Sequence, residues 1–481
     1  MRHFLLAAVL VVLATASVAE SAKTPRRGGG PAVVPPSFFE NTSVRTLVTD
    51  GFCSGGHNVV NAGPAVHDQK VFIAYGKRPA NGLSCIGNAF DVKAFRAWNY
   101  SDGSGVTGMV TVDTVQVFFG TGGHDMPAIV ASSNGTESVI YGGEQLGLCC
   151  PPAHAPGVKE TTVADDTSSF GSMTRVPISG GTSENACGYD TNGTLHCVGQ
   201  KQSIASGGTD RGFDLVYYRR TASGTWQLST DAVSSWIVRK GSSADGSGTN
   251  GAPGCIPNSW NKGTTVYIIF TRAFDSCRGS YKDIHILKST DGGDNFCYVD
   301  GTNCFARTTG YTGSYDGIEN TYPRYRLFTG TVASGMAVAV LSNGNPVVVF
   351  GTTTALVSRV WNGSSWTTAT IDSNVTNHPH GVAVAVNSRD VIRVYAASGD
   401  SGVGAVKEYS SSNNGTSYSA TTLQADNGLL TRSFNARVFS SLGGKERILV
   451  TWVECGSNNC GVNDTDASTS SAKIMFVDRP Q

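Results

Sequence analysis

Two histidines, His124 and His380, stand just ahead of short runs of small and β-branched residues, in the segments GHDMPAIVA and HGVAVAV. When the internal repeats of the chain are aligned, the two imidazoles occupy equivalent positions. Histidine exchanges its proton near neutral pH, which suits it to act as a general base or acid. His378 and His380 also have the spacing of two metal ligands on a strand, but no third His or Cys ligand is evident nearby. No metal and no other cofactor is therefore predicted.

Further polar residues are expected around the same opening. Glu184 and Arg432 align close to the two histidines, and His57 lies in the loop before the first repeat. The segment ENTYPRYR (319–326) adds two tyrosines and two arginines, a mixture that suits stacking on sugar rings and binding of carboxylates. Together these groups indicate acid–base chemistry on an anionic ligand. Two simpler interpretations stay open: histidines that cap backbone carbonyls, and a connector whose arginines are exposed.

The elements that position these residues are short strands, because one unit recurs along the chain. It consists of a strand of small and β-branched residues, a turn of Gly, Asn or Asp, and a more hydrophobic strand. A second hairpin follows most copies, and four-stranded repeats of this size are typical of propeller blades. Seven copies are found, at residues 59–76, 123–143, 182–200, 251–272, 333–351, 380–398 and 433–454.

The repeat predicts an all-β fold, a single β-propeller with seven four-stranded antiparallel blades and with six blades as the nearest alternative. The last copy is followed by one strand only, SAKIMFVDR, and NTSVRTLVTDG (41–51) precedes the first copy without a partner. Pairing of these two segments would close the ring and remove exposed sheet edges. Residues 145–173 are expected to form an insertion in the second blade. A β-sandwich followed by a second β domain is the competing interpretation.

The beginning of the chain and its cysteines indicate an extracellular protein. Residues 1–19 have the basic, apolar and small-residue regions of a secretory signal peptide, residues 20–40 form a flexible Pro/Gly-rich leader, and residues 41–481 form the propeller. Twelve Cys residues permit complete pairing in an oxidising compartment. Close spacing predicts the pairs Cys187/Cys197, Cys297/Cys304 and Cys455/Cys460, and also Cys53/Cys85 and Cys255/Cys277.

The overall charge and hydropathy exclude two classes of partner. Lys+Arg and Asp+Glu both number 36, so the formal net charge of zero argues against nucleic acid and against an anionic membrane surface. No segment is long and apolar enough to predict membrane insertion. The number of N-glycosylation sequons fits a glycosylated surface, and the oligomeric state stays open. The sequons begin at Asn41, Asn99, Asn134, Asn192, Asn362, Asn374, Asn414 and Asn463.

Three turns share a motif. STDGGDNF (289–296) matches S-x-D-x-G-x-x-[WF], SSNNGTSY (411–418) has Asn in place of Asp, and TASGTW (221–226) is shortened. In such a turn the Asp side chain accepts hydrogen bonds from backbone amides, the Gly adopts a conformation closed to other residues, and the aromatic ring fills the gap between blades. The chain therefore resembles the Asp-box (BNR) β-propellers of the sialidase superfamily. Asp291 of this motif supports the fold and is not a catalytic candidate.

A second resemblance bears on chemistry. Sialidases proper carry an early Arg-Ile-Pro motif that this chain lacks, so sialidase activity is not expected. GHDMPA (123–128) resembles the D-H-N-x-P-A segment of BNR-type propellers that include ulvan lyases. That resemblance implies β-elimination on a uronate polysaccharide, with a base, a proton donor and a cation that neutralises the carboxylate. The candidates are His124 or His380 as the base, Tyr322 as the donor and Arg324 or Arg432 as the cation, with Glu184 and His57 binding substrate.

Two functions follow from these observations. The first is a secreted enzyme, a polysaccharide lyase or glycoside hydrolase, that processes an acidic polysaccharide at its axial pocket; the His, Arg and Tyr set favours it. The second is a noncatalytic carbohydrate-binding or extracellular-matrix propeller that has lost its site; the missing sialidase motif and the many sequons favour it. In both cases the expected partners are polysaccharides or glycoprotein glycans.

Overall fold

In the computed structural model, every regular element of the described residues is a β-strand, and the strand pairs are antiparallel. No helix in this part of the chain is long and apolar enough to cross a membrane. The structure describes residues 44–51, 64–77, 89–99, 105–116, 127–141, 155–178, 182–204, 211–230, 236–238, 252–273, 281–310, 325–375, 381–399, 403–440, 446–455 and 472–480.

Seven β-hairpins coincide with the seven copies of the sequence repeat. Each joins a first strand to a second strand through a short turn, and the hairpins predicted from the sequence are confirmed. They are β2 (Ala65–His67) with β3 (Lys70–Lys77), β6 (Ala128–Ala131) with β7 (Glu137–Tyr141), β11 (Ser183–Tyr189) with β12 (Leu195–Ile204), β16 (Ala252–Lys262) with β17 (Thr265–Ala273), β21 (Arg326–Val340) with β22 (Pro346–Thr352), β25 (Ala383–Val386) with β26 (Ile392–Ser398), and β29 (Leu430–Ser440) with β30 (Glu446–Cys455).

Further strands extend the first six hairpins outward, and in each case a third strand pairs with the second. In the fourth sheet, an isolated bridge between Lys288 and Cys297 joins the third and fourth strands, and the third strand also pairs with the first strand of the next hairpin. The third and fourth strands are β4 (Ala89–Asn99) and β5 (Thr107–Gln116), β8 (Gly157–Val163) and β9 (Asp166–Phe170), β13 (Arg211–Arg220) and β14 (Trp226–Leu228), β18 (Tyr281–Ser289) and β19 (Asn295–Phe296), β23 (Leu356–Trp361) and β24 (Trp366–Asp372), and β27 (Ala405–Ser411) and β28 (Ser419–Gln424). Short strands β10 (Thr174–Arg175), β15 (Trp236–Val238) and β20 (Phe305–Ala306) pair with β8, β13 and β19.

The two ends of the described chain meet in one sheet. Strand β31 (Ala472–Pro480) pairs with β30 on one side and with β1 (Arg45–Gly51) on the other. The predicted pairing of the first and last strands is therefore confirmed. Since β1 also touches β3 at one register position, a single strand order runs from β29 to β5.

The segment expected as an insertion in the second repeat belongs in part to the regular sheet. Residues 157–163 form β8, which pairs with β7, and residues 166–170 form β9, which pairs with β8. The expectation of an insertion over 145–173 was therefore wrong for this part. Its stretch KETTV ends in three β-branched residues, which favour a strand, and the tight turn at Asp165, whose φ is 58°, returns the chain on itself.

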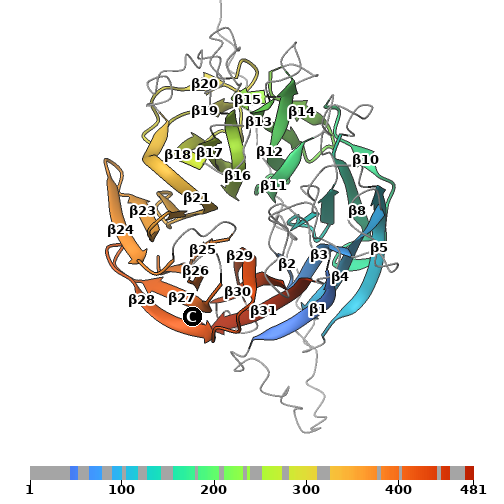
Figure 1. Cartoon of the computed structure of the whole chain (residues 1–481). Coiled ribbons are helices and arrows are strands. Elements are labelled where there is room, and N and C mark those ends of the chain that lie inside the picture. The colour runs from blue at the N-terminus through green and yellow to red at the C-terminus, as the bar shows by residue number, and fades with distance from the viewer. Residues whose placement is uncertain are drawn as a thin grey trace, which may run out of the picture.

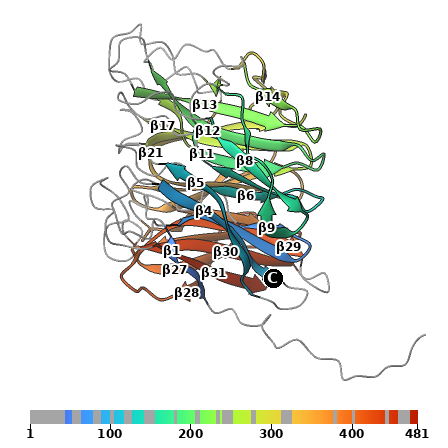
Figure 2. The same ribbon diagram turned by 90° about the vertical axis from the view of Figure 1, so that its right-hand side faces the viewer.

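The sheets are arranged radially, like the spokes of a wheel, with the first strands toward the centre (Figure 1), and Figure 2 shows the same ribbon from the side. Along the chain each first strand contacts the next, from β2 to β6, β11, β16, β21, β25 and β29, and β29 contacts β2. Seven apolar clusters lie between successive hairpins, and one of them joins Phe439 and Leu449 of the last hairpin to Val71 and Ile73 of the first. The core is thus divided among the gaps between sheets.

Hydrogen bonds join the seven hairpins to one another at or near the turns between their first and second strands. These turns therefore lie on one side of the molecule, here called the turn face. The opposite side, where the first strands begin, is called the start face. Because consecutive strands are antiparallel, the turns between third and fourth strands also lie at the turn face, and Gly292 N donates to Thr264 O across it (2.9 Å). The bonds between successive hairpins join His67 Nε2 to Ser133 O (3.1 Å), Ser138 Oγ to Tyr189 Oη (2.7 Å), Thr191 N to Gly263 O (3.2 Å), Tyr267 Oη to Gly344 O (2.8 Å), Ser342 N to Asp390 Oδ1 (2.6 Å) and Ser388 N to Glu446 Oε2 (3.0 Å).

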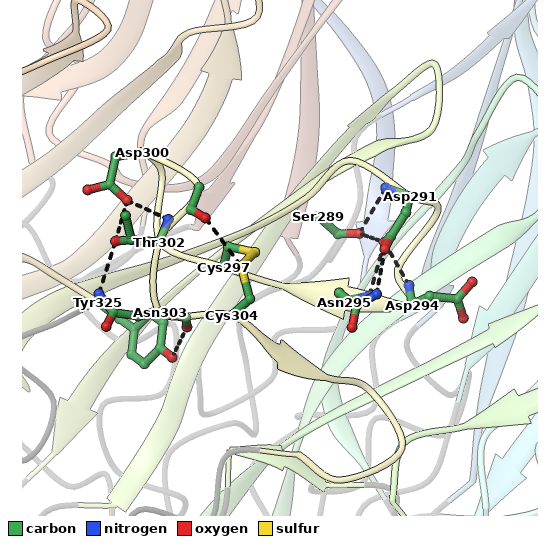
Figure 3. The surroundings of a disulfide bond; sticks show 11 residues. Ser289, Asp291, Asp294, Asn295, Cys297, Asp300, Thr302, Asn303, Cys304 and Tyr325 are labelled. Carbon is green, nitrogen blue, oxygen red and sulfur yellow. Dashed lines mark hydrogen bonds between the residues drawn. A yellow bond between two sulfur atoms is a disulfide. The ribbon is translucent and has the colours of Figure 1, made fainter.

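The turn at Asp291 has the local structure expected from its motif (Figure 3). Asp291 Oδ1 accepts hydrogen bonds from the backbone amides of Asp294 (3.1 Å) and Asn295 (3.0 Å). Gly293 has a φ of 86°, and Phe296 is fully buried against Tyr217 of the preceding sheet. The motif thus fixes a turn and supplies an aromatic contact between two sheets, away from the first strands.

Two of the predicted disulfides are present. Cys187 and Cys197 face each other across the third hairpin, and Cys297 and Cys304 close the small loop beside Asp291 that Figure 3 shows. The pairs predicted for Cys53/Cys85, Cys255/Cys277 and Cys455/Cys460 involve residues outside the described part of the chain. Both observed bonds staple neighbouring segments, so they stiffen single sheets and do not link distant ones.

A buried ion cluster joins the last two sheets. Glu408, only 3% exposed, receives Arg393 Nη1 at 2.9 Å from its own sheet and Arg479 Nε at 3.2 Å from β31. Tyr395 Oη donates to the second carboxylate oxygen at 3.0 Å. Although burial opposes ionisation, the two guanidinium groups hold the pKa of Glu408 below its ordinary value. The carboxylate is therefore a fixed charged link between sheets.

Candidate functional site

Two of the residues predicted to do chemistry, Glu184 and Arg432, lie near the beginning of first strands, at the start face. Glu184 is the second residue of β11 and Arg432 the third of β29, and both are described by their backbone. By sequence, His124 precedes β6 by four residues and His380 precedes β25 by three. Five of the seven predicted residues lie outside the described residues: His57, His124, Tyr322, Arg324 and His380. The side-chain contacts among the seven stay a prediction, and the described residues show how the segments leading to them are held.

A buried amide fixes the backbone next to Glu184. Asn185 Oδ1 accepts hydrogen bonds from Thr182 Oγ1 (2.9 Å) and from Tyr218 Oη (2.9 Å) of the third strand. Burial raises the pKa of Tyr218 far above its ordinary value, so the phenol stays a donor. Because Thr182 and Asn185 flank it on both sides, Glu184 sits on a segment with two fixed ends.

A buried carboxylate fixes the approach to Arg432. Glu454, which is 3% exposed, pairs in register with the residue just before Arg432. Its Oε1 accepts hydrogen bonds from Gln424 Nε2, from Asn427 Nδ2 (3.3 Å) and from Trp452 Nε1 (3.5 Å). Gln424 ends β28 and Asn427 lies in the connection to β29, so the carboxylate ties this connection to β30. It positions the strand that carries Arg432.

A third anchor lies where the chain leaves β24 toward His380. Asp372 Oδ2 accepts hydrogen bonds from Tyr409 Oη (2.6 Å), Ser398 Oγ (3.2 Å) and Lys407 Nζ (3.4 Å). Although burial opposes ionisation, the hydrogen bond from Tyr409 and the charge of Lys407 hold the pKa of Asp372 below its ordinary value. The ionised carboxylate therefore ties the end of the fifth sheet to the sixth.

The structure also shows a charged cluster at the turn face that the sequence did not predict. His67 Nδ1 lies 2.7 Å from Asp165 Oδ1, its Nε2 lies 3.1 Å from Ser133 O, and Lys70 Nζ donates to Asp165 Oδ2 at 3.1 Å. Burial alone would lower the pKa of His67, but the hydrogen bond and the charge of Asp165 raise it above its ordinary value. The cluster is an ion pair between the first two sheets.

His67, Asp68 and Asp165 lie close enough together to be considered as metal ligands, and their bonding argues against it. Both ring nitrogens of His67 face acceptors, which favours the imidazolium form, and an imidazolium has no lone pair to give a metal. Lys70 already occupies the second oxygen of Asp165. The bonding of the described residues therefore fits a salt-bridge network better than a metal centre.

Glu137, beside this cluster, is an unusual carboxyl. It is 0% exposed, its Oε2 accepts one hydrogen bond from Thr161 Oγ1 (3.0 Å), and its Oε1 has no hydrogen-bond partner. Burial, and then the negative charge of Asp165, raise the pKa of Glu137 to about 7, against the opposing effect of Thr161. A group that titrates near neutral pH is typical of catalytic sites, but this one has no solvent exposure and lies at the turn face.

A second buried group has the bonding pattern of a catalytic relay. His196 Nε2 lies 3.2 Å from Asp190 Oδ2, and its Nδ1 lies 2.6 Å from Tyr217 Oη. All three side chains are at least 95% buried, and burial lowers the pKa of His196, which favours the neutral ring. A polymeric substrate has no access to the relay, so it stabilises the third hairpin and does no chemistry.

Sequence reasoning missed the cluster around His67 because Asp165 is far from its other members in the chain. His67 and Asp165 are separated by 98 residues, and only the contact between the first and second sheets brings them together. The sequence contains one signal that could have pointed to Asp165. Asp165 falls in a Val-Ala-Asp-Asp turn, and an acidic residue in a turn with positive φ commonly marks a fixed position.

Comparison with known proteins identifies a class of fold. No protein-family model and no curated protein matches the sequence. Among solved structures, two of a PL25 ulvan lyase superpose with a TM-score of 0.60 at 12% and 13% identity, covering 89% of this chain and 94% of theirs. One of these is bound to -[GlcA(1-4)Rha3S]-. The polysaccharide lyase Uly1 gives a TM-score of 0.53 at 10% identity, over 90% of this chain and 98% of that one. The chain therefore has the fold of these polysaccharide lyases.

Proposed function

We propose that residues 41–481 form one closed, seven-bladed β-propeller of the Asp-box type. The cyclic contacts of the seven first strands support seven blades, and so do the seven apolar clusters between successive hairpins. The pairing of β1 with β31 supports closure, because it supplies the last sheet with a strand from each end of the chain. The Asp291 turn supports the Asp-box assignment.

On this scaffold the protein is a polysaccharide lyase that cleaves an acidic, uronate-containing polysaccharide at the start face. The observation that carries the proposal is the likeness to polysaccharide lyases, which extends over about nine-tenths of both chains. The glucuronate in one of those structures fits a substrate with a carboxylate. His124 supports the same activity, because its GHDMPA segment resembles the corresponding segment of ulvan lyases.

The proposed reaction is a β-elimination at C4 and C5 of the uronate. His124 or His380 removes the proton from C5 of the uronate, and Arg324 or Arg432 neutralises the carboxylate while negative charge builds on it. The electron pair forms a C4–C5 double bond as the C4–O bond breaks. Tyr322 gives its proton to the leaving oxygen, while Glu184 and His57 bind neighbouring sugar hydroxyls.

Secretion is part of the same proposal. Residues 1–19 act as the signal peptide and residues 20–40 as a leader. The disulfides Cys187–Cys197 and Cys297–Cys304 support an oxidising compartment, which suits an enzyme that meets an extracellular polysaccharide.

The test is the absorbance of unsaturated uronate during incubation with a panel of uronate polysaccharides. The wild type is expected to raise the absorbance, and His124→Ala is expected to reduce the rate by about 100-fold or more. His67→Gln is the matched control, because it changes a histidine at the turn face and is expected to keep the activity. New reducing ends without absorbance would replace the lyase with a hydrolase. Neither product, together with binding on a glycan array, would establish a noncatalytic carbohydrate-binding propeller instead.

A further inference from the structure

Four exposed turns share the sequence Asn-Gly-Thr or Asn-Gly-Ser. In each the Asn side chain is exposed and the following Gly has a positive φ, between 75° and 101°, so the chain reverses tightly at the sequon. The pattern Asn-x-Ser/Thr is the acceptor for N-linked glycosylation. The four asparagines are Asn134, Asn192, Asn362 and Asn414.

All four turns lie at the turn face. Asn134 and Asn192 lie in the turns between first and second strands, β6–β7 and β11–β12. Asn362 and Asn414 lie in the turns between third and fourth strands, β23–β24 and β27–β28, which the antiparallel order brings to the same side. For the last turn a contact agrees, because a Cβ on Gly415 would lie 3.6 Å from Ile392, the first residue of β26.

We propose that these four asparagines carry N-linked oligosaccharides and that the turn face is the glycosylated face of the molecule. The sequence alone offers eight sequons scattered from Asn41 to Asn463 and predicts no such asymmetry. Among the sequons whose asparagine and hydroxyl residue both lie in the described part of the chain, all four have an exposed asparagine and lie at the turn face.

The side-chain geometry accommodates a sugar. Asn134 uses its Oδ1 to accept hydrogen bonds from Ser132 Oγ and from Thr136 N (3.2 Å), and no acceptor faces its Nδ2 among the described residues. Asn362 likewise accepts through Oδ1, and its Nδ2 donates to Ser365 Oγ at 3.0 Å. A glycosylated amide keeps one hydrogen on Nδ2, so this last bond survives substitution.

The chemistry needs a donor that the host supplies, a lipid-linked oligosaccharide diphosphate. The amide Nδ2 attacks the anomeric carbon of the first N-acetylhexosamine, and a C–N bond forms as the bond from that carbon to the diphosphate oxygen breaks. The lipid diphosphate leaves with the bonding electrons, and a base of the host transferase takes the proton lost from Nδ2. No oxidation state changes.

A buried sequon provides the contrast. Asn99 ends β4 and is 4% exposed, and a bulky hydrated glycan has no room there in the folded protein. Asn374 is exposed, but it follows the fourth strand β24 and so lies toward the start face, at the outer rim. It is not among the four assigned positions. The first strands at the start face thus stay clear of the proposed sugars, whatever the protein binds there.

The experiment uses the full chain secreted from a eukaryotic cell line. The glycoprotein is treated with peptide-N-glycosidase in water labelled with oxygen-18, which converts each occupied Asn to labelled Asp, and the peptides are mapped by mass spectrometry. Labelled Asp is expected at Asn134, Asn192, Asn362 and Asn414 in the majority of molecules, with unmodified Asn at Asn99. Unlabelled Asp at these Asn-Gly sites reports spontaneous deamidation of a bare Asn and counts against the proposal.

A matched pair of variants separates the sequon from the turn. Among the described residues, Thr136 makes hydrogen bonds only through its backbone N and O, so Thr136→Ala removes the sequon without removing a turn hydrogen bond, and Thr136→Ser keeps both. Thr136→Ala is expected to lose the sugar at Asn134 alone, and Thr136→Ser to retain it, with both variants secreted and melting like the wild type. Unmodified Asn at all four positions, or a glycan on Asn99, would overturn the proposal.

Discussion

Glu137 offers a test of how burial sets the energetics of the contact between the first two sheets. Its carboxyl is fully buried beside Asp165, holds one hydrogen bond from Thr161 and leaves Oε1 without a partner. The substitution Glu137→Gln replaces the acid by a neutral group of the same shape. The variant keeps an acceptor for Thr161 and removes the ionisation.

The sign of the pH dependence follows from the raised pKa. The ordinary pKa of a glutamate is 4.5, and the pKa of Glu137 in the folded protein is about 7. Between these two pH values the Glu137 carboxyl has lost its proton in the unfolded chain and still holds it in the folded chain. The folded state then binds more protons than the unfolded state, so its stability falls as the pH rises through this window. Below the window Glu137 makes no contribution, and above it the whole penalty is present.

The free-energy cost of ionising Glu137 follows from the difference between its folded and unfolded pKa. At about 1.4 kcal/mol for each tenfold change in proton affinity, ionising Glu137 in the folded protein costs about 3 kcal/mol. With an unfolding entropy of about 2.1 cal/mol/K per residue over about 440 residues, this corresponds to about 3 °C in melting temperature. Glu137→Gln is therefore expected to match the wild type at about pH 4 and to melt about 3 °C higher at about pH 8.

The assay is thermal unfolding of both proteins by differential scanning calorimetry at several pH values. Asp426→Asn, which neutralises an exposed carboxylate, is the matched control and is expected to shift the melting temperature by less than about 1 °C throughout. Two results would refute the reasoning: a difference in melting temperature between Glu137→Gln and the wild type that does not grow with pH, or a variant that melts lower than the wild type at about pH 8. Either result would mean that Glu137 ionises in the folded protein at little cost.

Three further substitutions probe the contacts between sheets. His67→Gln is expected to lower the free energy of unfolding by up to about 1 kcal/mol at acidic pH, and by less as the pH rises through the raised pKa of His67. Urea titrations at several pH values measure this loss. Gly293→Ala would place a Cβ 2.0 Å from Tyr217 Oη at a φ of 86°, so a loss of more than about 2 kcal/mol is expected; an unchanged urea midpoint would show that the ring moves aside. Glu408→Gln leaves two guanidinium groups facing a neutral amide, and a loss of about 3 to 5 kcal/mol is expected, whereas high salt should leave this loss nearly constant because the cluster is buried.

Much of the fold could be predicted from the sequence because each hairpin is determined by a short, continuous segment of the chain. The runs AVAVLSNGNPVVVFG and AVAVNSRDVIRVYAAS contain two strands and their turn, and each became a hairpin at the predicted place, β21–β22 and β25–β26. Residues 145–173 misled the prediction. Their Cys, Pro and Gly residues at the beginning look like an irregular loop, while the strand KETTV behind them is short and polar on one side.

The candidate site was less predictable, for a physical reason. An equivalent position in a repeat places a backbone at the start face, as it does for Glu184 and Arg432. It does not fix where a side chain points, which depends on neighbours from other repeats. The clusters around Asp165 and Asp372 show this, because each draws its partners from two sheets. Convergence of His124, His380 and Tyr322 on one substrate stays a prediction that the activity assay tests.

The pairing of β1 with β31 has a consequence for how the protein is made. Thr46 Oγ1 donates to Met475 Sδ across this pair, 429 residues further along the chain. During synthesis, β1 lacks this partner until the strand 429 residues further along the chain has also been made. Contacts of such long range form slowly, and the unpaired strand exposes its backbone meanwhile. The pairing of β1 with β31 can therefore form only after β31 has been made, and until then the unpaired edge of β1 is a surface that a chaperone could protect.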